Sequence, residues 1–416
     1  MARANPPMRT WVEVDLGALA RNLQRVRARR PTLDLIAVIK ADAYGHGAVP
    51  VARALETAGA AMLGVGDSRE ALELIQAGIK LPLLILGAII DGEAEAVVAH
   101  GIRTTIHSFD RAASLEAEAA RQGRVHPVHL KVDTGMSRLG LMPERALEVA
   151  DFVHWSPHLF LEGLSTHMAT SRLDRHEESN RQLALFEDVH RRLTEHVGPI
   201  PWVHCRNSAA AWNPRVEESV STALRVGASL YGIPGPGDVA TPFEPAMSLR
   251  SQILFMKDVP AGTPVGYDGR YVTPAPTRLA VLPVGYHDGL PAAASPDGFV
   301  LIHGRPAPIR GSVSMDYTTV DVTHIPGCRT GDIALVFGRD PMGEAPLKTL
   351  AEKARSSPYA VTCGIGRRVH RVYLPPRPAL RVHNDCSGRA ARGGSTEDGY
   401  HWGSAACFTD FKGEFE

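Results

Sequence analysis

Eight short, continuous apolar runs in the first part of the chain constrain its fold more than any other feature. Because they are continuous rather than alternating, they are typical of strands that are buried on both faces, as in a parallel sheet. The runs are Leu35–Ile39, Ala61–Val65, Leu83–Leu86, Arg103–Ile106, Val128–Val132, Leu161–Ser165, Trp202–Cys205 and Thr222–Val226.

Helical patterns separate several of these runs. In DSREALELIQAG, Asp67 can cap the N-terminus, Glu70 follows three residues later, and Gly78 stands past the end. In EESNRQLALFEDVHRRL, one face carries Leu183, Phe186, Val189 and Leu193. Eight strands separated by helices predict an α/β fold of the (β/α)8 TIM-type barrel class. A doubly wound sheet of similar length is the alternative.

The pattern changes after about Pro245. Strand-like segments such as RLAVLPVGYHDGL and GFVLIHGRPAPI alternate with Gly/Pro turns at short intervals, and few helical patterns occur. We therefore predict a barrel domain over residues 1–245 and a mostly β C-terminal domain over residues 246–376. Residues 377–416 contain few aliphatic residues and the segment SGRAARGGSTEDG, so we expect a disordered tail there.

Composition narrows the class of protein. Lys+Arg and Asp+Glu each total 45 of the 416 residues, and this zero formal net charge argues against nucleic acid or an anionic membrane as partner. No apolar run has the roughly 18 residues of a membrane helix, and the N-terminus lacks a signal-peptide core. The five cysteines are scattered and show no CxxC spacing, so neither a zinc site nor a disulfide framework is indicated. We expect a cytoplasmic enzyme that acts on a small molecule, without a metal.

Polar residues follow several of the predicted strands, where a barrel carries its chemistry. They are Lys40, Arg138, His167, Asn207, Ser208, Arg225 and Gly227. Taken singly, a strand-end lysine is more often a solvated surface group, and a lone histidine is more often packed than catalytic. Taken together, glycines and a hydroxyl after the last two strands suit a phosphate, and a lysine among cations suits Schiff-base chemistry. Pyridoxal 5′-phosphate (PLP) joins a phosphate to an aldehyde, so this pattern suggests PLP as cofactor.

The stretch AVIKADAYGHGA resembles the cofactor-binding signature of bacterial alanine racemases. The resemblance continues in order through WVEVDLGAL, HLKVDTGMSRLG, THMAT, RNSAA, RVGASLYG, VGYDGRY, LPVGYHDG and GSVSMDYT. It covers roughly residues 11–375 and leaves out the C-terminal tail.

The resemblance implies a role for each of these residues. Lys40 would carry the cofactor and act as one acid/base group, and Tyr267 would be the second, because racemisation needs a proton removed on one face and returned on the other. Arg225 would sit at the pyridine nitrogen, leave it unprotonated, and so favour proton exchange over other PLP chemistry. The remaining cofactor-binding residues would be Tyr44, Ser208, Gly227 and Ala228 at the phosphate and His167 in the hydrogen-bond network around the ring, together with Asn207. Arg138 and the backbone N–H of Met315 would hold the substrate carboxylate.

The resemblance also implies a homodimer with shared active sites, because in the family the tyrosine matching Tyr267 reaches the neighbouring subunit's site. In many relatives the lysine matching Lys131 carries a carbamate that orients the arginine matching Arg138. A lysine paired with a nearby acid is the alternative at this position.

Two departures from the family pattern stand out. Relatives usually place a tyrosine where Arg367 (or Arg368) falls, at the inner entrance, so broader specificity for serine or longer amino acids is open. Ser314 replaces a frequent cysteine, which is a mild change.

Alanine racemisation that supplies D-alanine for peptidoglycan is the leading hypothesis. The alternatives are a serine/lysine racemase, or a decarboxylase or aldolase of the same fold group. Further alternatives are a non-catalytic PLP-binding protein and a metal-dependent hydrolase, for which His167 lacks a second ligand at metal spacing.

Overall fold

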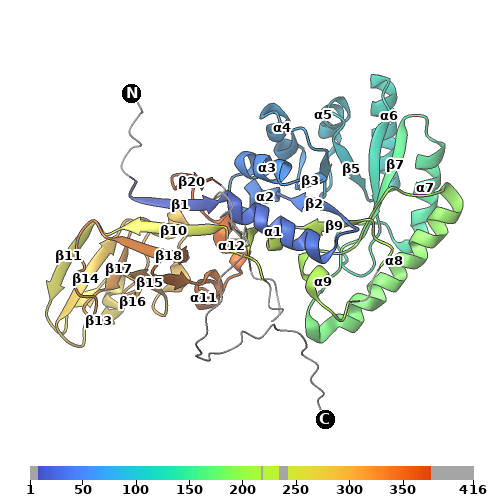
Figure 1. Cartoon of the computed structure of the whole chain (residues 1–416). Coiled ribbons are helices and arrows are strands. Elements are labelled where there is room, and N and C mark those ends of the chain that lie inside the picture. The colour runs from blue at the N-terminus through green and yellow to red at the C-terminus, as the bar shows by residue number, and fades with distance from the viewer. Residues whose placement is uncertain (1–7, 217–218, 234–241, 376–416) are drawn as a thin grey trace, which may run out of the picture. The chain divides into compact units, whose positions relative to one another are not determined.

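The computed structural model describes residues 8–216, 219–233 and 242–375. Eight parallel strands form the first sheet, in the order β8-β7-β6-β5-β4-β3-β2-β9 (Figure 1). Every predicted run falls on one of them, which confirms the (β/α)8 class. The strands are β2 (Asp34–Val38), β3 (Met62–Val65), β4 (Leu83–Ile85), β5 (Arg103–Ile106), β6 (His126–Lys131), β7 (Leu159–Ser165), β8 (Trp202–His204) and β9 (Ala223–Val226).

The sheet is a nearly closed barrel. Strands β2 and β9 pair in parallel, which joins the last strand to the first. Between β8 and β9 the chain makes only scattered backbone bonds, from Thr222 N–H to the Val203 carbonyl at 2.9 Å and from Arg225 N–H to the Arg206 carbonyl at 3.3 Å.

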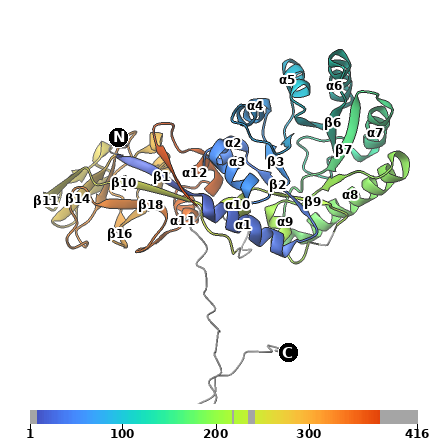
Figure 2. The same ribbon diagram turned by 45° about the horizontal axis from the view of Figure 1, so that its top comes forward.

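The barrel helices lie outside the strands (Figures 1 and 2). As predicted, Asp67 caps α4 by accepting from the Glu70 N–H at 3.0 Å, and the apolar face of α8 is buried. The helices are α1 (Leu16–Arg29), α2 (Lys40–Tyr44), α3 (Ala48–Thr57), α4 (Ser68–Gln76), α5 (Ala94–Ala99), α6 (Phe109–Gln122), α7 (Ala146–Trp155), α8 (His176–Val197), α9 (Ser208–Trp212) and α10 (Ala228–Tyr231).

The second domain is mostly β, as predicted, and has its own apolar core. A larger sheet has the order β16-β15-β18-β10-β1-β20, with β19 paired to β18, and a smaller sheet has the order β11-β14-β17. Strands β12 and β13 form a short hairpin. The strands are β1 (Thr10–Asp15), β10 (Met247–Gln252), β11 (Phe255–Val259), β12 (Pro264–Val265), β13 (Tyr271–Val272), β14 (Thr277–Leu282), β15 (Phe299–Ile302), β16 (Arg305–Pro308), β17 (Thr318–Asp321), β18 (Ile333–Asp340), β19 (Gly343–Ala345) and β20 (His370–Leu374), with helices α11 (Leu347–Lys353) and α12 (Pro358–Cys363).

Strand β1 corrects the predicted domain division. It pairs antiparallel with β10 and parallel with β20, so residues 10–15 belong to the second sheet and not to the barrel domain over 1–245. Val12 and Val14 are buried in the core of the second domain, and this period of two is the strand signal in TWVEVD. The predicted tail, residues 377–416, lies outside the described residues. Within the described ranges, no helix combines the length and apolar character needed to cross a bilayer.

Candidate active site

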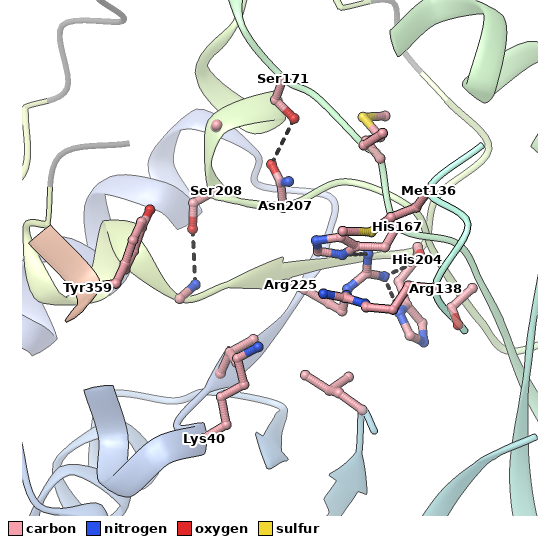
Figure 3. A pocket seen from close by; sticks show the side chains of 18 of the residues that line it. Lys40, Met136, Arg138, His167, Ser171, His204, Asn207, Ser208, Arg225 and Tyr359 are labelled. Atoms are coloured by element: carbon pink, nitrogen blue, oxygen red, sulfur yellow. Dashed lines mark hydrogen bonds between the residues drawn. The ribbon is translucent and has the colours of Figure 1, made fainter. Parts of the chain in front are cut away.

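A cavity of about 800 Å³ opens at the C-terminal ends of the barrel strands (Figure 3). Every barrel residue predicted for the site lines it. These residues are Lys40, Tyr44, Lys131, Arg138, His167, Asn207, Ser208, Arg225, Gly227 and Ala228. The structure thus brings together side chains from both ends of the barrel sequence.

Lys40 stands where β2 gives way to a left-handed turn. Residues 41–44 all have positive φ, between 52° and 56°, a conformation that costs about 1–2 kcal/mol per residue outside glycine. Contacts from two directions hold the turn: the Ala41 N–H donates to Glu70 Oε1 at 2.6 Å, and Arg371 Nε donates to the Gly45 carbonyl at 2.8 Å. The turn places the Lys40 and Tyr44 side chains at the same cavity.

Two lysines in the cavity have perturbed acidity. Desolvation by the surrounding walls, followed by the guanidinium of Arg138, lowers the pKa of Lys40. Burial, followed by Arg225 and Arg138, lowers the pKa of Lys131 to about 8. Both amines therefore lose their protons more readily than an ordinary lysine, as amine chemistry on a carbonyl requires.

Arg225 is 6% exposed and its guanidinium is almost fully engaged. Nη1 donates to Nδ1 of His204 at 2.6 Å and to the His204 carbonyl. Nη2 donates to the carbonyls of Thr166 at 2.6 Å and Cys205 at 3.1 Å. A guanidinium has five N–H groups, and within the described residues the Nε–H has no protein acceptor. One N–H of a rigid, buried cation is therefore left for a ligand.

His167 is a neutral neighbour of this cation. Its Nδ1 lies 3.3 Å from Arg225 Nη2, which can only donate, so His167 accepts there. Burial, followed by the Arg225 charge, lowers the pKa of His167 to about 3. The ring is neutral at physiological pH, which agrees with a role in hydrogen bonding rather than in charge.

Ser208, Gly227 and Tyr44 form one corner of the cavity. Ser208 Oγ accepts from the Gly227 N–H at 3.0 Å and from the Ser229 N–H at 3.4 Å. A Cβ on Gly227 would lie 2.5 Å from the Tyr44 hydroxyl oxygen, so only glycine lets that hydroxyl approach. The corner thus presents hydroxyl and N–H groups, which suits a phosphate.

Asn207 lines the cavity and caps helix α9. Its Oδ1 accepts from the Ala210 N–H at 3.0 Å as the N-cap of α9, and from Ser171 Oγ at 3.2 Å. These bonds to Oδ1 support the loop that presents Ser208, and contact of Asn207 with a cofactor stays a prediction.

Arg138 extends from a loop that is organised around Asp133. The Asp133 carboxylate accepts from the N–H groups of Gly135 and Met136, both at 2.8 Å. The Arg138 guanidinium is exposed to the cavity beside His167 and Met136 (Figure 3). An arginine presented in this way can bind a carboxylate with two parallel hydrogen bonds.

Tyr267 and Met315 are not brought to the cavity of their own chain. Tyr267 lies in the turn between β12 and β13 and is 69% exposed, and Met315 is 52% exposed. Neither residue lines the cavity. Within one chain, the predicted acid/base pair is therefore separated.

Sequence reasoning missed Tyr359, which lines the cavity with its ring 6.0 Å from that of Tyr44. Ser357 caps helix α12, and such a cap can be recognised in a sequence. That α12 packs beside Tyr44 is a tertiary contact that no local pattern indicates. Arg367 is exposed and does not line the cavity. Arg368 instead bonds Asp288 at 2.7 Å and Asp316 at 2.6 Å, which joins two loops of the second domain.

Comparison with known proteins decides the family. Residues 14–234 match the alanine racemase N-terminal domain, and residues 246–373 match the alanine racemase C-terminal domain. The chain belongs to the alanine racemase family. It is accordingly an enzyme of an isomerase family.

Individual alanine racemases are similar to this chain in sequence and in fold over 86–89% of its length. The enzyme from Syntrophobacter fumaroxidans is 38% identical over 362 residues, covering 86% of this chain and 96% of that protein. The alanine racemase from Halothermothrix orenii is 36% identical over 367 residues, covering 88% and 96%. A crystal structure of alanine racemase from Streptomyces lavendulae, a D-cycloserine producer, has a TM-score of 0.84 at 34% identity and covers 89% of this chain and 98% of that one. The Bartonella henselae alanine racemase, solved with covalently bound pyridoxal phosphate, has a TM-score of 0.79 at 27% identity, covering 88% and 100%.

Proposed function

We propose that this alanine racemase interconverts L- and D-alanine with PLP and two acid/base groups on opposite faces of the substrate. The observation that carries the proposal is the Arg225 guanidinium, which lines the same cavity as Lys40 and the Ser208–Gly227 corner and whose Nε–H has no acceptor among the described residues. That arrangement fits a molecule with a phosphate at one end and a ring nitrogen at the other. The Bartonella henselae relative with covalently bound pyridoxal phosphate supports the assignment.

The residues of this chain divide the work by their chemistry. Bound PLP would supply an aldehyde for the substrate amine and a conjugated ring that makes the Cα proton acidic. Tyr44 and Ser208 hold the phosphate with the backbone at Gly227 and Ala228. Arg225 donates to the ring nitrogen and, as a guanidinium, does not give up its proton, so that nitrogen stays unprotonated. Arg138 binds the alanine carboxylate.

Lys40 holds the cofactor and exchanges the Cα proton on one face. Burial, followed by the Arg138 charge, lowers its pKa, which makes the neutral amine more available than in an ordinary lysine, as a general base requires. A single group cannot readily take a proton from one face and return it on the other, so the opposite face needs a second acid/base group.

We assign that second group to Tyr267 of the partner subunit in a head-to-tail homodimer. The exposure of Tyr267 and Met315, together with their absence from the cavity of their own chain, supports this assignment. Symmetric dimers are the commonest assemblies, and two composite sites would form in each dimer.

Lys131 is proposed to carry a carbamate. Among the charges that act on its amine, the cations Arg225, Arg138 and Lys40 outweigh the Asp133 carboxylate, which speaks against the alternative of a close acid pair. With a pKa of about 8, a sizeable neutral fraction exists to attack CO₂, forming an N–C bond and releasing the amine proton. The anion would then offset the charges of Arg138 and Arg225.

The cellular role that we propose is the supply of D-alanine for peptidoglycan in the cytoplasm. An arginine beside the ring nitrogen favours a racemase over a decarboxylase, for which an acidic partner is typical.

Chiral analysis of the products is the decisive test. PLP-loaded protein is incubated separately with L-alanine, L-serine and L-lysine, with Lys40→Ala as the matched control. The proposal is supported if the parent protein forms D-alanine rapidly, forms little D-serine or D-lysine, and Lys40→Ala forms none of them. D-serine or D-lysine at comparable rates indicates the broader racemase. Amine products without any D-isomer would refute racemisation and favour the decarboxylase.

A further inference from the structure

A chain of four hydrogen-bonding steps runs from Arg225 into the barrel core. Arg225 Nη1 lies 2.6 Å from His204 Nδ1, and His204 Nε2 lies 2.9 Å from His129 Nδ1. His129 Nε2 lies 3.1 Å from Glu162 Oε2. The Glu162 carboxylate also accepts from Nε and Nη2 of Arg103, at 3.0 and 3.1 Å.

The chemistry of the two ends fixes the direction of every bond. A guanidinium can only donate and a carboxylate can only accept. His204 Nδ1 must therefore accept, so His204 carries its proton on Nε2 and donates it to His129. His129 Nδ1 accepts in turn, and its Nε2–H donates to Glu162. Burial is the main cause that lowers the pKa of both His129 and His204, which agrees with two neutral rings.

Two local features of β6 and β7 make room for the His129 ring. The β6–β7 register shifts between Val128 and His129, an irregularity of the kind that re-aims a side chain. Its neighbour on β7 is Gly163, where a Cβ would lie 2.3 Å from His129 Nδ1. His129 is 0% exposed and His204 is 1% exposed. Polar rings are costly to bury, and here each ring nitrogen has a partner.

We propose that Glu162 is a positioning residue for the reaction, acting through His129 and His204 to hold the Arg225 guanidinium in the orientation that points Nε–H at the ring nitrogen. This inference deepens the proposed function and rests on it. Glu162 touches neither substrate nor cofactor, because it does not line the cavity. Because its carboxylate can only accept, the hydrogen bonds from Arg225 to Glu162 cannot all run in the opposite direction.

Replacing the carboxylate by an amide removes that constraint. In Glu162→Gln, the amide oxygen can still accept from His129, but the amide N–H₂ can also donate to His129 Nε2. The second arrangement moves the proton of each histidine to Nδ1. His204 Nδ1–H would then face an Arg225 N–H at the present 2.6 Å, so the guanidinium must move away.

The test compares Glu162→Gln with Arg103→Gln in the PLP-loaded enzyme. Both variants lose the same Arg103–Glu162 ion pair, but Arg103→Gln keeps the acceptor-only carboxylate. For Glu162→Gln we expect about a tenfold fall in kcat with KM for alanine within about twofold, the lower end of what supporting partners contribute elsewhere. The absorption band of the bound cofactor should shift in the same variant. Arg103→Gln should keep kcat within about twofold and the parent band.

Equal effects of the two variants on kcat and on the band would refute the positioning role and leave an ion pair that only stabilises the barrel. The ¹⁵N spectrum of histidine-labelled parent protein gives a readout that needs neither variant folding nor racemisation. A proton on Nε2 of both His129 and His204 is expected, and a proton on Nδ1 of either ring overturns the chain. If the parent fails to racemise alanine, the proposed function falls, while this spectrum still decides the direction of the bonds.

Discussion

Gly227→Ala tests how the cavity corner binds the cofactor. The change adds a methyl group to Gly227 on the side of the Tyr44 ring. That methyl carbon would lie 2.5 Å from the Tyr44 hydroxyl oxygen and 3.1 Å from Cζ. Ordinary contact begins near 3.4 Å, so the hydroxyl must retreat by about 1 Å. A hydrogen bond from Tyr44 to a phosphate does not survive such a shift.

The expected loss follows from the strength of a hydrogen bond to a charged group. Such bonds contribute about 1.5–3 kcal/mol, and each 1.4 kcal/mol is tenfold in affinity. Gly227→Ala should therefore weaken PLP binding by about 10- to 150-fold. Tyr44→Phe removes the same hydroxyl and should produce a similar loss. With the hydroxyl already gone, adding Gly227→Ala should cost little more, because the closest contact no longer exists.

The assay is a PLP titration of the apo-protein followed by absorbance, for the parent, both single variants and the double variant. Urea unfolding of each apo-protein is the control, and the free energies should agree within about 1 kcal/mol. Losses that simply add in the double variant would show that Gly227 acts independently of Tyr44. Parent-like affinity in Tyr44→Phe would remove the hydroxyl from the phosphate site altogether.

Three further predictions concern the proton-transfer groups, the carbamate and the buried histidines. Lys40→Ala should lose racemisation and covalent cofactor attachment, yet mixing it with Tyr267→Phe should restore part of the activity after subunit exchange; no recovery despite demonstrated exchange would contradict composite sites. Intact mass of the parent should show the increment of one CO₂ that disappears on acidification and is absent in Lys131→Arg, whereas an increment retained by that variant would place the carbamate elsewhere. Burial lowers the pKa of His126 from its ordinary 6.5 to about 4, so the unfolded chain binds this proton first and the free energy of unfolding falls as the pH drops from 6.5 towards 4. His126→Asn should flatten that pH dependence by about 1.4 kcal/mol per pH unit, measured by urea unfolding, and an unchanged slope would mean that His126 does not titrate as described.

Local patterns predicted what depends on local chemistry. The buried strands appeared as apolar runs, and Asp67 appeared as a cap, because their signals lie within a few residues. The cavity residues were predictable because every parallel barrel strand delivers its next residue to the same end. Strand β1 was assigned to the wrong domain because its partners β10 and β20 lie hundreds of residues along the chain, and no local signal names them.

The supporting residues could not be predicted for a related reason. His129 and Glu162 lie within apolar strands, where a polar residue has no visible partner until the strands are arranged in order. Tyr359 follows a recognisable helix cap, but only the docking of α12 brings its ring towards Tyr44. Sequence patterns identify the groups at strand ends, while the partners that orient those groups depend on tertiary contacts.

Electrostatics connects the three ligands proposed for the cavity. Lys40, Lys131, Arg138 and Arg225 all line it, and its lining contains no carboxylate in the described part of the chain. Desolvation, followed by the neighbouring cations, raises the free energy of each protonated lysine and so lowers its pKa. A phosphate at Ser208, a substrate carboxylate at Arg138 and a carbamate on Lys131 would each add the negative charge that this cavity lacks. The Glu162 carboxylate does not fill this shortage, because it lies outside the cavity lining and both of its oxygens bond Arg103.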